Sequence, residues 1–171
     1  MNFMELARSR FAVRKFSDKA VEEEKLAHIL EVGNLAPTAK NNQPQRIYVL
    51  KSEESLKKLA ELTHCGYGAG LVLLFTYNVE EDWKNPQETG VHSGVEDVSI
   101  VATHIMLAAA EVGLATCWCN YFSNSRLEET FNLPKNERSV LIMPVGYAAD
   151  NVKPTALHTK RKALGDIVQI L

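Results

Sequence analysis

Basic residues gather in two short stretches near the two ends of the chain, and both could bind an anion. The first, RSRFAVRKF, contains Arg8, Arg10, Arg14 and Lys15 and no acidic residue, and the second is HTKRK at 158–162. The ends of a compact domain often lie close together, so the two stretches could share one ligand. Paired guanidinium groups suit a phosphate monoester, because they donate charge-assisted, bidentate hydrogen bonds. The alternative is that each stretch is a solvated surface, although apolar residues interleave the first one and would fix its guanidinium groups.

Length, composition and charge restrict the kinds of protein that the chain can be. Its 171 residues, 46% of them hydrophobic, predict one globular domain over residues 1–171. The net charge of −2 argues against a nucleic-acid partner, and no run approaches the ~18 apolar residues of a membrane span. A polar N-terminus and three cysteines are typical of a reducing compartment. We therefore expect a cytoplasmic protein with a small anionic ligand and no membrane partner.

Helical and strand-like segments alternate along the chain, but without the regular spacing of a doubly wound sheet. We expect helices over 2–9, 21–33, 52–62, 95–113 and 125–134, and strands over 46–50, 71–77, 114–122 and 139–147. In these predictions Gly33 ends the second helix, Ser52 caps the third, and Glu96 and Asp97 open the fourth. The fourth helix is apolar on nearly every face, which predicts burial in the core or at a subunit interface. The pattern favours an α+β fold of three layers around a mixed or antiparallel sheet.

Other site signatures carry little weight. The glycines of GYGAG precede a strand rather than a helix, so they lack the context of a dinucleotide-binding turn. Cys117 and Cys119 are interpreted as buried structural cysteines rather than metal ligands, and we expect no metal site. His92 either touches a ligand or faces water.

Five motifs together resemble the FMN-dependent nitroreductase family. They are RSRFAVRKF, APTAKNNQPQ, LAAAEVGLATCWC, LPKNERSVLIMPVGY and HTKRKALGDIV, and they occur in the order and approximate spacing of that family over nearly the whole chain. The resemblance implies a three-layer α-β-α nitroreductase-like fold. It also implies a homodimer that holds FMN at the subunit interface.

The resemblance assigns residues to the cofactor by position. Arg10 and Arg14, with Lys160 or Arg161, would bind the FMN phosphate, and residues 119–121 would lie near the flavin N5 and O4. The full implied set is Arg10, Phe11, Ala12, Arg14, Pro37, Thr38, Ala39, Asn41, Gln43, Cys119, Asn120, Tyr121, Lys160 and Arg161. Two positions depart from the family: many relatives have serine where this chain has Phe11 or Ala12, and tryptophan where it has Gln45.

The resemblance also implies the reaction. NADH or NADPH would pass a hydride to the flavin, and an electron-poor acceptor such as a nitroaromatic or a quinone would then be reduced in a ping-pong cycle. No side chain is nominated as a catalytic acid or base. Tyr67, Trp83 and Tyr121 are candidates for the acceptor pocket, with packing or loop anchoring as the alternative for each. The other functional hypothesis is a protein that stores or senses FMN with little turnover.

Overall fold

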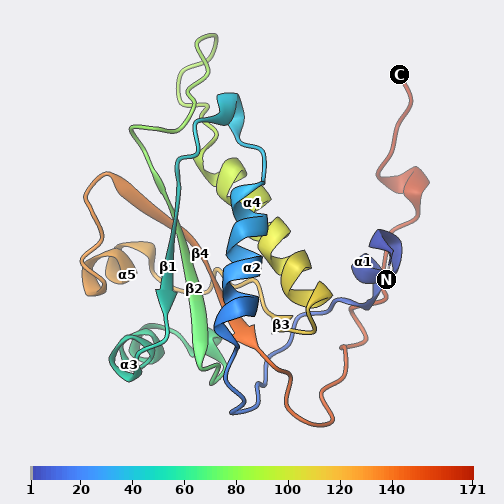
Figure 1. Cartoon of the computed structure of the whole chain (residues 1–171). Helices are drawn as coiled ribbons and strands as arrows, with labels where there is room; N and C mark the ends of the chain where they lie inside the picture. The colour runs from blue at the N-terminus through green and yellow to red at the C-terminus, as the bar shows by residue number, and fades with distance from the viewer. Residues whose placement is uncertain (1) are drawn as a thin grey trace.

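A four-stranded antiparallel sheet forms the middle layer of the protein (Figure 1). The computed structural model describes residues 2–171. The strands are β1 (Gln45–Leu50), β2 (Leu71–Asn78), β3 (Ala115–Thr116) and β4 (Glu137–Gly146), in the order β1-β2-β4-β3. Every pair of neighbouring strands is antiparallel. Of the two kinds of sheet expected from the sequence, the structure therefore has the antiparallel one.

Helices cover both faces of this sheet. They are α1 (Phe3–Ser9), α2 (Glu23–Asn34), η1 (Ala39–Asn41), α3 (Glu53–Leu62), η2 (His64–Gly66), α4 (Gly94–Glu111), α5 (Asn124–Thr130) and η3 (Leu164–Asp166). Figure 1 shows α2 and α4 against one face, with α3 and α5 on the other. Side chains alternate along β2: Leu73 and Phe75 join the core under α2 and α4, and Leu74 joins the core under α3 and α5. The predicted three-layer α+β architecture is confirmed.

Gly33 does not end α2, contrary to the sequence prediction. The helix continues to Asn34, and Gly33 is buried where α2 crosses α4. A Cβ atom at this position would lie 2.6 Å from Cδ1 and Cγ1 of Ile105. Glycine is thus required for the close approach of two helices, which the local sequence does not reveal.

The strand predicted over 114–122 is wrong beyond its first residues. The regular ladder of β3 stops at Thr116, and the next backbone bond, from Cys117 N to Pro144 O, is 3.4 Å long. Proline has no N–H, so Pro144 cannot return a hydrogen bond and the ladder is interrupted. Cys119 pairs with Ile142 again in an isolated bridge. The segment 117–121 is therefore irregular backbone held at the edge of the sheet.

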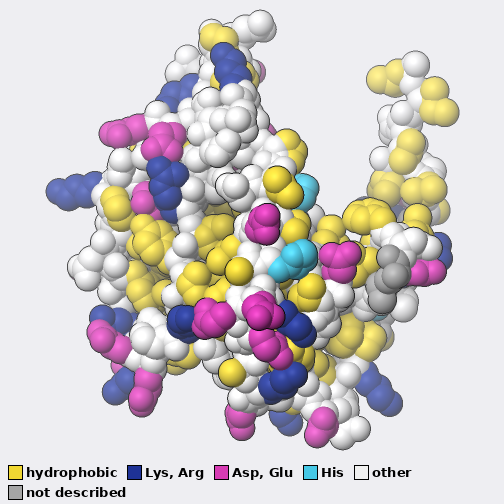
Figure 2. All heavy atoms as spheres, in the orientation of Figure 1, with side chains coloured by type: hydrophobic (Ala, Val, Ile, Leu, Met, Phe, Trp, Pro, Cys, Tyr) yellow, Lys and Arg dark blue, Asp and Glu magenta, His cyan; other side chains and the backbone are white. Residues whose placement is uncertain are grey.

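Apolar side chains remain exposed on α4 and, as a second surface, at the end of the chain. On α4, Val95 is 50% exposed and Ile100 is 38% exposed, although most apolar residues of this helix are buried. The second surface is the end of the chain, which Figure 2 shows as a largely hydrophobic arm standing away from the body. Its exposed residues are Leu164, Ile167, Val168, Ile170 and Leu171. Among the described residues, no helix combines the length and the apolar character needed to cross a membrane.

Candidate functional site

A basic pocket of about 510 Å³ lies where the two basic stretches meet. Its lining residues are Arg10, Phe11, Ala12, Arg14, Thr155, Leu157, His158 and Arg161. His158 joins the stretches, because its Nε2 donates to the carbonyl of Arg8 at 3.0 Å and its ring lies 6.1 Å from that of Phe11. The structure therefore brings together residues that are about 150 positions apart in the sequence. Of the two cations predicted from the second stretch, Arg161 lines the pocket and Lys160 does not.

The pocket carries unbalanced positive charge. Within residues 2–171, no carboxylate lies within ion-pair distance of Arg10, Arg14 or Arg161. This charge also affects a neighbouring thiol. The pKa of Cys117 is lowered to about 7 by its hydrogen bond with the Cys119 thiol and by the positive charges of Arg14 and Arg10. Three guanidinium groups without acidic partners have the charge and the hydrogen-bond donors that suit a doubly charged anion such as a phosphate monoester.

The effect of the arginine charge can be measured as a change in the pKa of Cys117. In the ligand-free protein we expect the ultraviolet thiolate absorbance to rise with a midpoint near pH 7. Because Arg14 stabilises the thiolate, Arg14→Ala should move this midpoint to higher pH. Cys117→Ser is the control and should remove the transition. An unchanged midpoint in Arg14→Ala would show that the guanidinium group does not act on this thiol.

The predicted flavin-edge residues Pro37, Thr38, Ala39, Asn41 and Gln43 lie together in one loop, the 37–43 loop, which contains η1. Its backbone is unusual, since Asn41 and Gln43 have φ values of 56° and 52° and Lys40 one of 52°. A left-handed conformation costs a residue with a side chain about 1–2 kcal/mol. Such a loop needs hydrogen bonds to keep its shape.

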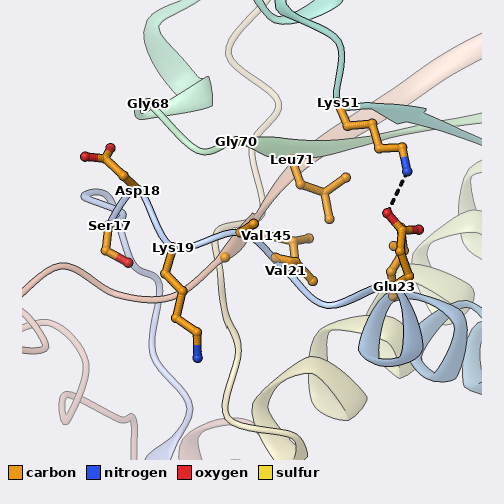
Figure 3. A pocket seen from close by; sticks show the side chains of 13 residues that line it. Ser17, Asp18, Lys19, Val21, Glu23, Lys51, Gly68, Gly70, Leu71 and Val145 are labelled. Carbon is orange, nitrogen blue, oxygen red and sulfur yellow. Dashed lines mark hydrogen bonds and ion pairs between the residues drawn. The ribbon is translucent and has the colours of Figure 1, made fainter.

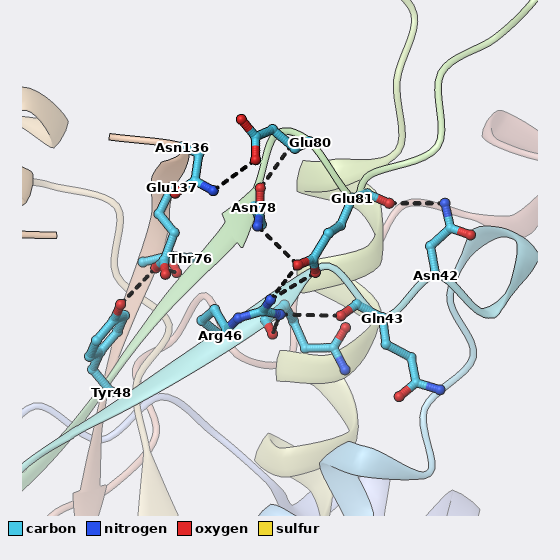
Figure 4. Close-up of polar contacts among 11 residues, drawn as sticks. Asn42, Gln43, Arg46, Tyr48, Thr76, Asn78, Glu80, Glu81, Asn136 and Glu137 are labelled. Carbon is cyan, nitrogen blue, oxygen red and sulfur yellow. Dashed lines mark hydrogen bonds and ion pairs between the residues drawn. The ribbon is translucent and has the colours of Figure 1, made fainter. Parts of the chain in front are cut away.

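Several contacts supply this support. Inside the loop, Gln43 N donates to Thr38 Oγ1 at 3.1 Å, and Gln43 Nε2 donates to Asn41 Oδ1 at 2.9 Å. Outside it, Asn42 Nδ2 donates to the carbonyl of Glu81 at 2.9 Å, as Figure 4 shows. The Glu81 carboxylate in turn accepts from both Arg46 and Asn78. The loop is therefore fixed in advance, as a binding surface for a rigid ring system requires.

The third predicted group, residues 119–121, offers backbone donors beside the exposed side chain of Tyr121. Cys119 is buried, and the exposed Asn120 donates its side-chain amide to the carbonyl of Val140 at 2.7 Å. Among the hydrogen bonds of residues 2–171, none uses the backbone N–H of Asn120 or Tyr121. Two consecutive free donors are available for a ligand acceptor at this point.

Tyr67 and Tyr121, two of the three acceptor candidates, lie near each other because both contact His64. The ring of His64 lies 6.1 Å from that of Tyr67 and 5.5 Å from that of Tyr121. Thr63 adds a bond from its hydroxyl to the carbonyl of Tyr121 at 2.6 Å. Sequence reasoning missed Thr63 and His64 because neither belongs to a recognisable motif. Trp83 is not part of this group. It follows β2 in the chain and Tyr67 precedes it, so the two residues lie toward opposite ends of that strand.

The arginine pocket and the 37–43 loop lie at opposite ends of α4. Ala39 is bonded to Asp97 in the first turn of this helix. Arg10 shares a small cavity with Gly113, just beyond the last turn. Asp97 and Gly113 are sixteen positions apart, nearly all of them helical, which corresponds to about 24 Å at 1.5 Å per residue. A single chain therefore keeps the arginine pocket and the 37–43 loop at opposite ends of one helix.

The nitroreductase family model matches residues 7–67 and 65–147, which together make up most of the chain. The chain belongs to the nitroreductase family. The resemblance inferred from the five motifs is thereby confirmed at the level of the family.

Solved and curated relatives agree with this membership. A nitroreductase family protein from Clostridium difficile 630 is 37% identical, with a TM-score of 0.92 over 99% of this chain and 98% of that one. An FMN-dependent nitroreductase from Clostridium difficile R20291 is 26% identical, with a TM-score of 0.74 over 89% and 90%. An NADPH-dependent oxidoreductase from Staphylococcus haemolyticus is 27% identical over 163 residues, or 86% of this chain and 65% of that one.

This nitroreductase family protein has a further cavity of about 370 Å³ at the start of α2. Figure 3 shows its charged rim, where Lys51 points to Glu23 and their side chains form an ion pair of 2.8 Å. Leu71 and Val145 contribute to its apolar floor. None of the predicted cofactor or acceptor residues lines this cavity, so it is separate from the candidate site.

Proposed function

We propose that the protein is an NAD(P)H-dependent FMN oxidoreductase in which Arg10, Arg14 and Arg161 hold the FMN phosphate. The observation that carries this proposal is the basic pocket, whose three guanidinium groups have no acidic partner among residues 2–171. When bound, FMN would supply hydride transfer from a nicotinamide coenzyme to an electron-poor acceptor such as a nitroaromatic or a quinone. The family membership and the names of the relatives support this chemistry.

The remaining predicted residues would bind and orient the flavin ring. The 37–43 loop would line one edge of it, with Asn41 and Gln43 as polar contacts. The free N–H groups of Asn120 and Tyr121 would donate hydrogen bonds where negative charge develops during reduction. Tyr67 and Tyr121, with His64 between them, would line the acceptor pocket, and Trp83 would approach it from the other half of the site.

The proposed assembly is a homodimer with FMN between the protomers. A second copy would place its 37–43 loop against the arginine pocket of the first, which joins the two halves that α4 keeps apart in one chain. The same contact would cover the exposed apolar residues of α4 and of the C-terminal arm, whose exposure in a lone chain is unfavourable. Here α4 would take the subunit-interface role that its sequence pattern allows.

An anaerobic visible spectrum of the FMN-reconstituted protein, recorded before and after NADH or NADPH, tests the proposed function. We expect flavin bands in a one-to-one ratio to chain, and rapid bleaching by at least one coenzyme. Bound flavin that neither coenzyme bleaches would favour the storage or sensing hypothesis. A protein that binds no FMN would refute the proposed site.

Arg10→Ala should weaken FMN binding by about 1.5 to 3 kcal/mol, the scale of a hydrogen bond to a charged group. In dissociation constant this is roughly a 10- to 150-fold increase, measurable by quenching of flavin fluorescence. Arg8→Ala is the matched control, because Arg8 does not line the pocket and its carbonyl still accepts from His158. Equal FMN affinity in the two variants would count against a phosphate site at Arg10.

A further inference from the structure

Asp97 is a buried carboxylate that holds two separate segments of the chain. Its Oδ1 accepts from the backbone N–H of Ala39 at 2.8 Å, and its Oδ2 accepts from the hydroxyl of Ser93 at 2.7 Å. Asp97 is 2% exposed and Ser93 is 3% exposed. A carboxylate shielded from water is costly unless its oxygens are satisfied, so both bonds are strongly favoured.

Ser93 extends this connection to the segment 80–93. Its Oγ accepts from Trp83 N at 3.2 Å, and its own N–H donates to the carbonyl of Trp83 at 2.9 Å. Contacts of Asp82 also link the beginning and the end of this segment. Its buried carboxylate lies 3.0 Å from Lys84 Nζ and 2.6 Å from His92 Nδ1. A displacement of Ser93 would therefore move Trp83 and its neighbours together.

We infer that Asp97 is a positioning residue that couples the 37–43 loop to the segment 80–93. The inference rests on the proposed function, in which FMN contacts the 37–43 loop. A ligand that holds Ala39 in place favours the arrangement in which Asp97 also holds Ser93, and through Ser93 it orders Trp83. Coupling between sites is reciprocal, so the placement of Trp83 also affects the binding of FMN. Acceptor recognition by Trp83 would thus depend on flavin occupancy.

A second connection between the two segments offers a competing route. Asn42 donates to the carbonyl of Glu81 (Figure 4). This contact is exposed, so water competes with it. The route through Asp97 is buried: Asp97 binds the N–H of Ala39 directly, and it binds the hydroxyl of Ser93, which in turn accepts from Trp83 N. The two routes can be separated by substitution, because they share no side chain.

Amide hydrogen exchange of the full chain, without and with FMN, tests the inference. The reporters are the N–H groups of Ala39 and Trp83, and the reference is that of Ile142, which is bonded to Cys119 on the sheet. Without FMN, Asp97→Ala should accelerate exchange at Ala39 and Trp83 by about tenfold, whereas Ser93→Ala should do so at Trp83 alone. Exchange at Ile142 should be unchanged in both variants.

The second measurement is the change in amide exchange when FMN is added. In the unmodified chain, exchange at Trp83 should slow by about tenfold. The response should be lost in Ser93→Ala and retained in Asn42→Ala. Retention in Ser93→Ala, or loss in Asn42→Ala, would overturn the inference and place the coupling on the Glu81 route.

The ligand-free measurements keep this inference distinct from the proposed function. If the unmodified chain binds no FMN, the proposed function fails, and the coupling to flavin fails with it. Exchange at Ala39 and Trp83 would still show whether Asp97 holds both segments. If Asp97→Ala accelerates exchange at Ile142 as well, the variant is globally unfolded, and Ser93→Ala and Asn42→Ala then decide between the routes.

Discussion

A mixed dimer of two defective protomers is expected to recover one intact FMN site. One protomer carries Arg10→Ala and Arg14→Ala, which remove the phosphate contacts and should weaken binding by about 3 to 6 kcal/mol if the two losses add. The other carries Asn41→Ala and Gln43→Ala, which remove polar contacts and place alanine at positive φ. If each site takes its arginines from one chain and its loop from the other, one site of the mixed dimer has both halves intact.

The measurement is FMN stoichiometry in mixed dimers purified through two different affinity tags. Half of the unmodified stoichiometry should be recovered at nearly unmodified affinity, while each variant alone binds weakly. If the site is built within one chain, every site in the mixed dimer carries one defect, and no recovery occurs. The experiment therefore distinguishes a shared site from two separate ones without a structure of the complex.

Gly94→Ala is expected to be strongly destabilising. A Cβ atom at Gly94 would lie 2.2 Å from Cδ2 and 2.3 Å from Cε2 of the buried Tyr77 ring. An aromatic ring cannot yield as a flexible side chain does, so we expect a cost of about 3 kcal/mol, the upper end of ordinary overpacking. For a chain of this length that is a fall in Tm of roughly 6–12 °C, measurable by calorimetry.

Gly70→Ala is the matched control for this prediction. A Cβ atom at Gly70 meets nothing within 4 Å, and its backbone is not in the left-handed region. We expect its Tm to stay close to that of the unmodified protein. Equal stability of the two variants would mean that α4 begins with more room beside Tyr77 than the structure shows.

The elements that were predicted best from the sequence are those determined by a local pattern of residues. The apolar run from Leu71 predicted β2, and the side chain of Ser52 caps α3 as expected, accepting from Ser55 N. The basic stretches were also predicted to meet, because Arg10 and Arg161 lie near the ends of the chain. In these cases neighbouring residues carry the information, and distant contacts do not override it.

The failures have a common physical cause, which is a partner far away in the sequence. Gly33 was interpreted as a helix end, but its role depends on Ile105. The strand predicted through Cys117 is broken by Pro144. Asp97 was predicted only to open a helix, whereas its carboxylate holds Ala39, which lies 58 positions away. No local pattern marks such contacts, and they are the ones that shape the candidate site.

If the FMN site is shared as proposed, the separation of its two halves by α4 makes cofactor retention depend on protein concentration. If each FMN molecule needs both chains, flavin binding and subunit association are linked by mass action, and each one strengthens the other. Apparent FMN affinity should then fall when the protein is diluted, and free flavin should favour association. Cells that express little of this protein would therefore hold it partly as flavin-free monomers, and a rise in expression would by itself increase the loaded fraction.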